Sequence, residues 1–179
     1  MVHPNLISDR FELKPVKSSD IENIYKGLSH PEVIRFYGVS FESMEETREQ
    51  MEWYADLIKN KTGVWWTISD KESGSFLGAA GLNDMNLDKG TAEIGFWLLP
   101  ENWGRGIMKE ALSTIIQYSF QTLNLKEIAG FVETENSNCI RIMEKLGFTL
   151  KKTLIDAEKK GDKRISLHVY TLNAIPDSL

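Results

Sequence analysis

The sequence is poor in the residues that form covalent cross-links and metal clusters. Cys139 is the single cysteine among 179 residues, and only three histidines are present. One thiol excludes an intramolecular disulfide, and one thiol with three scattered histidines does not supply the ligands of a zinc cluster. We therefore expect no bound metal, and a chain suited to the reducing cytoplasm.

Long apolar runs and long basic runs are also missing. No window approaches the ~20 apolar residues that a membrane helix requires, and residues 1–13 lack the charged start and apolar stretch of a secretory signal. The net charge of −5, without a long Lys/Arg run, argues against binding to a phosphate backbone. Neither a membrane nor a nucleic acid is an expected partner.

Length and composition fit one globular domain. The apolar fraction of 41% is that of ordinary folded proteins and above that of disordered chains. No repeat, linker or low-complexity segment divides the sequence, and its length suits a single core. We predict a single domain over residues 1–179.

The first half of the sequence predicts helices followed by a meander. Alternating apolar residues, bounded by polar turns, favour three consecutive antiparallel strands at 64–68, 75–82 and 91–99. Before them, the pattern predicts one strand and two helices, at 11–15, 21–28 and 44–59.

The second half alternates helices and strands. Helical spacing predicts helices over 108–120 and 136–146, the latter closed by Gly147. Strands are predicted at 128–132, 149–155 and 166–172, the last two joined by a turn at Gly161-Asp162. The fold class is therefore α+β, with a mixed, mostly antiparallel sheet. A doubly wound sheet fits poorly, because helices would have to separate nearly all its strands.

A strand that runs into a glycine turn and a helix is the most informative feature. Gly104 and Gly106 allow close approach of the backbone to a ligand, and the free N–H groups of a helix start attract an anion such as phosphate. The pattern is weak alone, since a tight turn without a ligand also uses it. Lys109 stands where a dinucleotide fingerprint has its third glycine, and no P-loop sequence is present.

A second cluster, residues 136–148, gives the turn its context. With the Trp-Gly-Arg-Gly loop at 103–106, the Asn136 helix start and Glu-Lys-Leu-Gly-Phe at 144–148, the chain resembles the GNAT superfamily of acetyl-CoA-dependent N-acetyltransferases. It looks most similar to the Rim-type branch, which acetylates the N-terminal amine of ribosomal proteins. The resemblance extends over residues 11–172.

The resemblance implies a three-layered fold and an acetyl-CoA site. Strands 91–99 and 126–132 would start as parallel neighbours and splay, leaving a gap for pantetheine. Main-chain groups of Phe96, Trp97 and Leu98 would pair with the pantetheine amides. The pyrophosphate would rest on the N–H groups of Trp103, Gly104, Arg105, Gly106, Ile107 and Met108, with Arg105 as a charge partner.

Glu93 matches the carboxylate that serves as general base in some members of the superfamily. Alternation sets it on the face opposite Ile94 and Phe96, where it could deprotonate an amine directly or through water. A strand glutamate equally often binds a backbone N–H or a cation. The amine would attack the thioester directly, with the oxyanion held by a backbone N–H near Leu98.

Three positions of the second cluster have roles implied by the resemblance. Cys139 stands where Rim-type members have a serine proposed to protonate the leaving thiolate, although a lone cysteine is more often apolar filler. Asn136 either caps the helix or binds the pantetheine or substrate amide. Met143 replaces the tyrosine acid of other branches, so that version of the mechanism is absent.

The acceptor is the least specified part of the hypothesis. A protein N-terminus leads, and a polyamine, an amino acid or an antibiotic is the alternative; a CoA-binding sensor without catalysis stays open as well. Trp66 is the aromatic candidate for an acceptor pocket. The expected assembly is a monomer or a homodimer.

Overall fold

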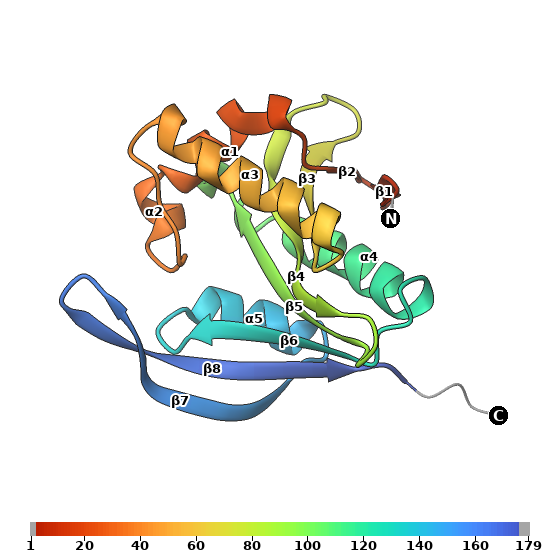
Figure 1. Cartoon of the computed structure of the whole chain (residues 1–179), viewed down its shortest axis with the longest axis vertical. Helices are drawn as coiled ribbons and strands as arrows, with labels where there is room; N and C mark the ends of the chain where they lie inside the picture. Colours follow the sequence, from red (N-terminus) through yellow and green to blue (C-terminus); the bar gives the residue numbers. More distant parts are fainter. Residues whose placement is uncertain (1–2, 176–179) are drawn as a thin grey trace.

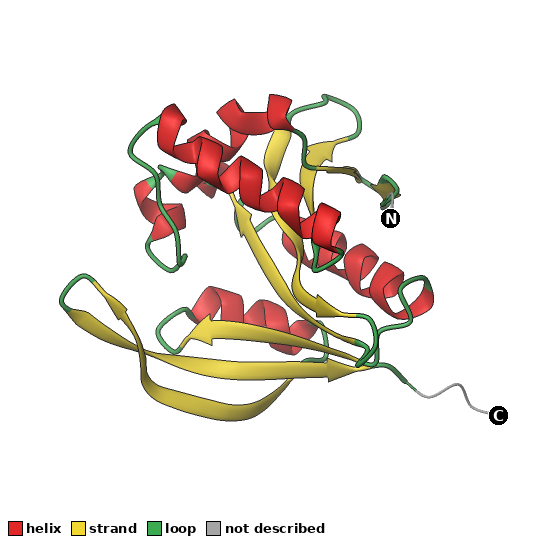
Figure 2. Ribbon diagram, viewed as in Figure 1, coloured by secondary structure: helices red, strands yellow, loops and turns green. Residues whose placement is uncertain are grey.

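A computed structural model describes residues 3–175 as an eight-stranded sheet with helices on both faces (Figures 1 and 2). The strand order is β1-β2-β3-β4-β5-β6-β8-β7. The strands are β1 (Leu6–Ile7), β2 (Phe11–Pro15), β3 (Val64–Asp70), β4 (Phe76–Asn86), β5 (Thr91–Leu98), β6 (Glu127–Glu133), β7 (Thr149–Lys160) and β8 (Lys163–Asn173). The helices are α1 (Ile21–Leu28), α2 (Pro31–Ile34), α3 (Met44–Asn60), α4 (Ile107–Gln121) and α5 (Ser137–Lys145), with short 3-10 turns at Ser18–Asp20 and Pro100–Asn102.

The predicted α+β class is confirmed, and the differences concern short or exposed elements. The sequence prediction missed β1 and α2, which have two and four residues and are too short to show a period. It also ended the strand predicted at 149–155 five residues early and began the strand predicted at 166–172 three residues late. β7 is exposed along almost its whole length, so no buried face marks it in the sequence. The predicted turn at Gly161-Asp162 is confirmed, since Lys160 pairs with Lys163 across it.

One parallel pair divides the sheet. All neighbouring strands are antiparallel except β5 and β6, which pair only at Thr91 with Glu127, Ala92 with Ile128 and Glu93 with Ala129. Beyond these three pairs the strands diverge, while β5 keeps β4 and β6 keeps β8 on their outer edges. The predicted splay is therefore present, and it opens one continuous sheet along its middle (Figure 1).

Each face of the sheet has its own core, which gives the predicted three layers. On one face, Ala111, Leu112 and Ile115 of α4 are fully buried together with Met143 of α5. On the other face, α1 and α3 bury a separate cluster that includes Ile24, Leu28, Tyr54, Leu57, Trp65 and Trp97. The splayed strands lie between these two cores.

Residues 3–175 contain neither a membrane-spanning helix nor a cluster of metal-binding side chains. No helix there has the length and apolar content needed to cross a bilayer. The same residues hold no group of three His, Cys, Asp or Glu side chains arranged for a metal ion.

Glycines on β4 and β5 let an indole lie flat on the sheet. A Cβ added at Gly81 would overlap the ring of Trp65 and the main chain of Val64, and one added at Gly95 would overlap the far edge of the same ring. Trp65 is 2% exposed as a result. This ring belongs to the hydrophobic core between the sheet and α3.

We predict that Gly81→Ala lowers the free energy of unfolding by about 1–3 kcal/mol, because the ring or the strand must shift. Urea denaturation measures the change. Gly38→Ala is the matched control, since a Cβ at Gly38 meets nothing within 4 Å, and it should change stability by less than about 0.5 kcal/mol. Equal stability of the two variants would contradict the close packing of Trp65.

Candidate functional site

A large cleft of about 1140 Å³ follows the line where β5 and β6 separate. On the α4 side its walls are the loop before α4, the start of α4, and α5. On the α1/α3 side they are the segment from α2 to α3 and the tip of the β7–β8 hairpin. The cleft thus passes through the sheet from one layer of helices to the other.

The glycine loop before α4 contains two residues in the left-handed backbone conformation. Gly104 and Gly106 have φ angles of 74° and 73°, and Gly106 is the N-cap of α4. An L side chain rarely adopts this left-handed conformation, whereas glycine does so without strain. A Cβ at Gly104 would meet nothing within 4 Å. The turn therefore needs these glycines for their backbone angles.

Five consecutive N–H groups follow without an acceptor in the described part of the chain. They belong to Gly104, Arg105, Gly106, Ile107 and Met108. Together with the positive end of the α4 dipole they form an anion site.

Trp103 was predicted to belong to the same set, and the structure corrects this. Its main-chain N–H donates to the Pro100 carbonyl at 3.1 Å, and its indole Nε1 donates to the Leu98 carbonyl at 3.0 Å. The 3-10 turn at Pro100–Asn102 therefore uses the N–H that the prediction left for the ligand. Trp103 therefore stabilises the loop through these two hydrogen bonds and offers no free main-chain N–H to a ligand.

The inner edge of β5 exposes main-chain groups to the gap. Leu99 N–H donates to the Leu77 carbonyl at 2.9 Å, so alternation also directs the main-chain groups of Trp97 towards β4. The predicted pairing of Trp97 with pantetheine through its main chain is therefore corrected. The main-chain groups of Phe96 and the N–H of Leu98 point into the gap instead, and their pairing with pantetheine stays a prediction.

Glu93 lies at the last residue pair before the splay, on the α1/α3 face of the sheet. It lines the cleft and is half-buried. Burial raises the pKa of its carboxyl, and the nearby carboxylates of Asp84 and Glu158 add to the rise, while a hydrogen bond from Asn83 opposes it. A carboxylate with a raised pKa is a stronger base than an ordinary surface glutamate.

The start of α5 brings Asn136 and Cys139 to the other wall of the cleft. Asn136 Oδ1 accepts from the Cys139 N–H at 3.1 Å, so the predicted capping role is confirmed. Burial raises the pKa of the Cys139 thiol to about 12. The thiol therefore stays protonated at neutral pH and is a weaker acid than a free thiol. Met143, one turn later, is fully buried in the α4-side core.

Aromatic side chains line the α1/α3 side of the cleft, and the sequence prediction chose the wrong tryptophan. Trp66 is fully buried in the α4-side core, with its Nε1 donating to the Pro4 carbonyl, and does not line the cleft. Its neighbour Trp65 does, because adjacent residues of a strand face opposite sides. Trp53 and Tyr37 join it there, and burial, with Tyr54 and Glu93 nearby, raises the pKa of Tyr37.

Lys160 spans the open end of the cleft. From the tip of the β7–β8 hairpin, its Nζ donates to the carbonyls of Ile34 and Arg35 at 3.0 and 2.6 Å. It also pairs with Glu133 at the end of β6 at 3.3 Å. This lysine contact joins the hairpin to the end of α2. No local pattern in the sequence indicates this contact, since Ile34 and Arg35 are more than 120 residues away from Lys160.

Charge is divided between the two sides of the cleft. Lys109 at the start of α4 lines one side with Arg141 and Lys145 of α5. Glu32, Glu49 and Glu93 line the other side, together with the cations Arg35, Lys159 and Lys160. An acidic chain thus has a cluster of cations beside its anion site, while the opposite side of the cleft carries both carboxylates and cations.

Comparison with known proteins assigns the chain to a family. Residues 10–149 match the acetyltransferase (GNAT) domain family. The sequence is 29% identical over 170 residues to the uncharacterized N-acetyltransferase YoaA of Bacillus subtilis. These residues cover 94% of this chain and 96% of that protein.

Two solved structures share the fold. One is spermidine N-acetyltransferase from Vibrio cholerae in complex with CoA and spermine, with a TM-score of 0.82, 20% identity and coverage of 92% of this chain and 95% of that one. The other is RimL, a ribosomal L7/L12 alpha-N-protein acetyltransferase in complex with coenzyme A, with a TM-score of 0.86, 18% identity and coverage of 95% and 98%. Since the family match spans most of the chain, this protein belongs to the GNAT acetyltransferase family and uses acetyl-CoA as the acetyl donor for an amine, in agreement with its Rim-type resemblance.

Proposed function

We propose that this protein is a single-domain cytoplasmic enzyme that acetylates a primary amine, with a protein N-terminus as the leading acceptor. The observation that carries the proposal is one cleft with an anion site on the α4 side and a carboxylate base on the other. The residues present suit acetyl-CoA, because the free N–H groups from Gly104 to Met108 match a diphosphate and the open edge of β5 matches the pantetheine amides.

Glu93 is the proposed base. Only a neutral amine attacks a thioester, so the carboxylate removes a proton from the acceptor ammonium, directly or through a water molecule. The Leu98 N–H, directed into the gap, is the proposed donor to the oxyanion that develops on the acetyl carbonyl. Cys139, protonated at neutral pH, is proposed to donate a hydrogen bond to the departing sulfur; the high pKa of its thiol makes it a poor source of a full proton.

The pH dependence of turnover tests Glu93. Its carboxylate must be ionised to act, so kcat/KM should fall as pH drops through its raised pKa. Glu93→Gln should lower kcat by about 100-fold or more and remove this acidic limb, with CoA affinity kept.

Asp84→Asn is the matched variant, because Asp84 raises the pKa of Glu93 from a neighbouring position without being the base. Removing this negative charge should move the acidic limb to lower pH and leave the maximal rate nearly unchanged. An unaltered pH profile in Glu93→Gln would exclude Glu93 as the base.

The loop glycine is tested by binding. Gly106→Val forces a β-branched residue into a left-handed conformation and should disturb the donor set, so we expect CoA affinity to fall by about tenfold or more, measured by calorimetry. Gly74→Val is the control, because Gly74 has a similar φ of 70° in the β3–β4 turn. If both variants bind CoA alike, the loop does not hold the diphosphate.

The free edge of β6 supports a protein N-terminus as the leading acceptor. Beyond Ala129 this strand has no partner on the side that faces β5, so its main-chain groups can pair with an extended peptide. A second candidate, a polyamine, is favoured by the carboxylates Glu32, Glu49 and Glu93 on that side of the cleft.

One incubation separates these acceptors. The protein is mixed with acetyl-CoA, peptides that begin with Ala or Ser, the same peptides with blocked N-termini and an internal lysine, polyamines and aminoglycosides. We expect mass spectrometry to find acetyl only on the free α-amines. Acetylated polyamine with unmodified peptides would support the second candidate, and CoA binding without any acetylated amine would indicate a sensor.

A further inference from the structure

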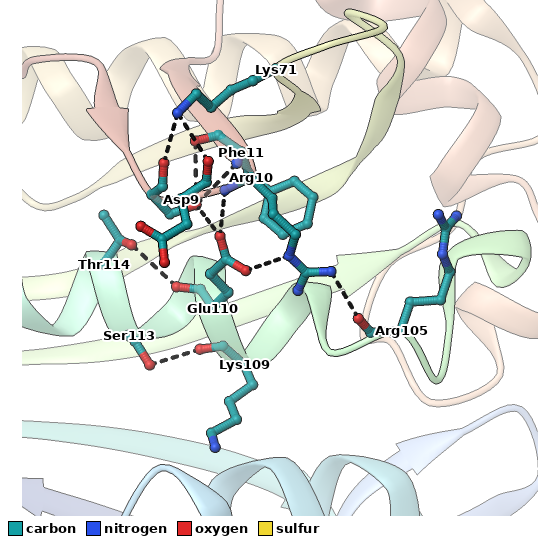
Figure 3. Close-up of polar contacts among 10 residues, drawn as sticks. Asp9, Arg10, Phe11, Lys71, Arg105, Lys109, Glu110, Ser113 and Thr114 are labelled. Atoms are coloured by element: carbon teal, nitrogen blue, oxygen red, sulfur yellow. Dashed lines mark hydrogen bonds and ion pairs between the residues drawn. The ribbon is translucent and has the colours of Figure 1, made fainter.

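The turn between β1 and β2 is fastened to the first turn of α4 (Figure 3). Glu110 Oε1 accepts from the Ser8 hydroxyl at 2.7 Å and from the Arg10 N–H at 2.8 Å. Lys71 holds the same turn from the other side by donating to the carbonyls of Ser8 and Asp9. The β1–β2 turn and the first turn of α4 therefore form one hydrogen-bonded unit.

Arg10 extends this unit to the glycine loop. Its Nε donates to Glu110 Oε2 at 2.7 Å, and its Nη1 donates to the Arg105 carbonyl at 3.3 Å. Its guanidinium also lies 4.7 Å from the centre of the Phe11 ring. A Cβ built on Gly106 would lie 3.7 Å from Arg10 Nη2, so the guanidinium covers the outer side of the loop. Figure 3 shows this path from Glu110 through Arg10 to Arg105.

The contact between Arg10 and the Arg105 carbonyl also determines the direction of the Gly106 N–H, because the peptide bond is planar. In a trans peptide the C=O of one residue and the N–H of the next point in opposite directions. Arg10 holds the Arg105 carbonyl outward, so the N–H of Gly106 points away from Arg10. Gly104 and Gly106 both have the flexible backbone of glycine. Without the contact from Arg10, the peptide between Arg105 and Gly106 would be free to turn over.

We propose that Arg10 is a positioning residue for the coenzyme diphosphate: through the Arg105 carbonyl it fixes the direction of the Gly106 N–H in the anion site. The inference rests on the proposed diphosphate role of this loop. It assigns a binding function to the β1–β2 turn, which lies outside the cleft, and it makes Glu110 the anchor that holds the guanidinium in place.

The test compares donors with and without the diphosphate. Arg10→Gln should weaken CoA and 3′-dephospho-CoA by a similar factor of about 10, measured by calorimetry. It should leave kcat/KM for S-acetylpantetheine, which has no phosphate, unchanged. Arg10→Lys should restore affinity only in part, because one ammonium cannot replace the fork that reaches Glu110 and Arg105 together. Arg48→Gln is the matched control, since it removes the same charge from an exposed position of α3.

Each other outcome overturns the proposal. A loss for CoA but not for 3′-dephospho-CoA would mean that Arg10 acts on the 3′-phosphate. An equal loss with S-acetylpantetheine, or a lowered melting temperature with no specific loss for the phosphate-bearing donors, would mean a general structural role. Unchanged affinity in Arg10→Gln would exclude any role in binding. Failure of the unaltered protein to bind CoA would instead contradict the proposed function of the loop.

Discussion

The early separation of β5 from β6 is the constraint on which the site depends. Main-chain groups in the interior of a protein need partners, and a strand that loses its neighbour after three residue pairs leaves several without one. The indole of Trp103 satisfies the Leu98 carbonyl. The remaining groups on that edge of β5 face the cleft, so an extended ligand with amides can take the place of the missing strand.

The separation also explains how an acidic chain can hold a polyanion. The splay lets the cleft reach both layers of helices, so opposite walls are built from different parts of the sequence. The α4 and α5 wall has cations and free N–H groups, whereas the opposite wall has carboxylates mixed with cations of the α2–α3 segment and the hairpin. The net charge of the chain says nothing about this division, which only the fold produces.

Local features of the site could be predicted from the sequence because they depend on local physics. The glycine turn that opens α4 and the cap at Asn136 follow from residues that lie next to one another. The position of Glu93 on one face of β5 follows from strand alternation. The parallel pair and its splay came from the resemblance to the family.

The remaining features depend on pairings that no local pattern encodes. Alternation separates Trp65 from Trp66 but does not say which face holds the cleft, and the wrong one was chosen. The prediction gave Trp103 a free N–H because the 3-10 turn that uses this group was not foreseen. Arg10 reaches a loop 95 residues further along the chain, which becomes visible only when the β1–β2 turn is set beside α4.

The contact of Lys160 with the end of α2 gives the cleft a second closed end. At one end the halves of the sheet are joined by the β5–β6 pairing, and at the other the β7–β8 hairpin is joined to the end of α2 by two hydrogen bonds from the Lys160 ammonium group. These two connections oppose a separation of the two sides of the cleft. The cleft stays open towards both layers of helices, so its two faces are the openings that connect it to solvent.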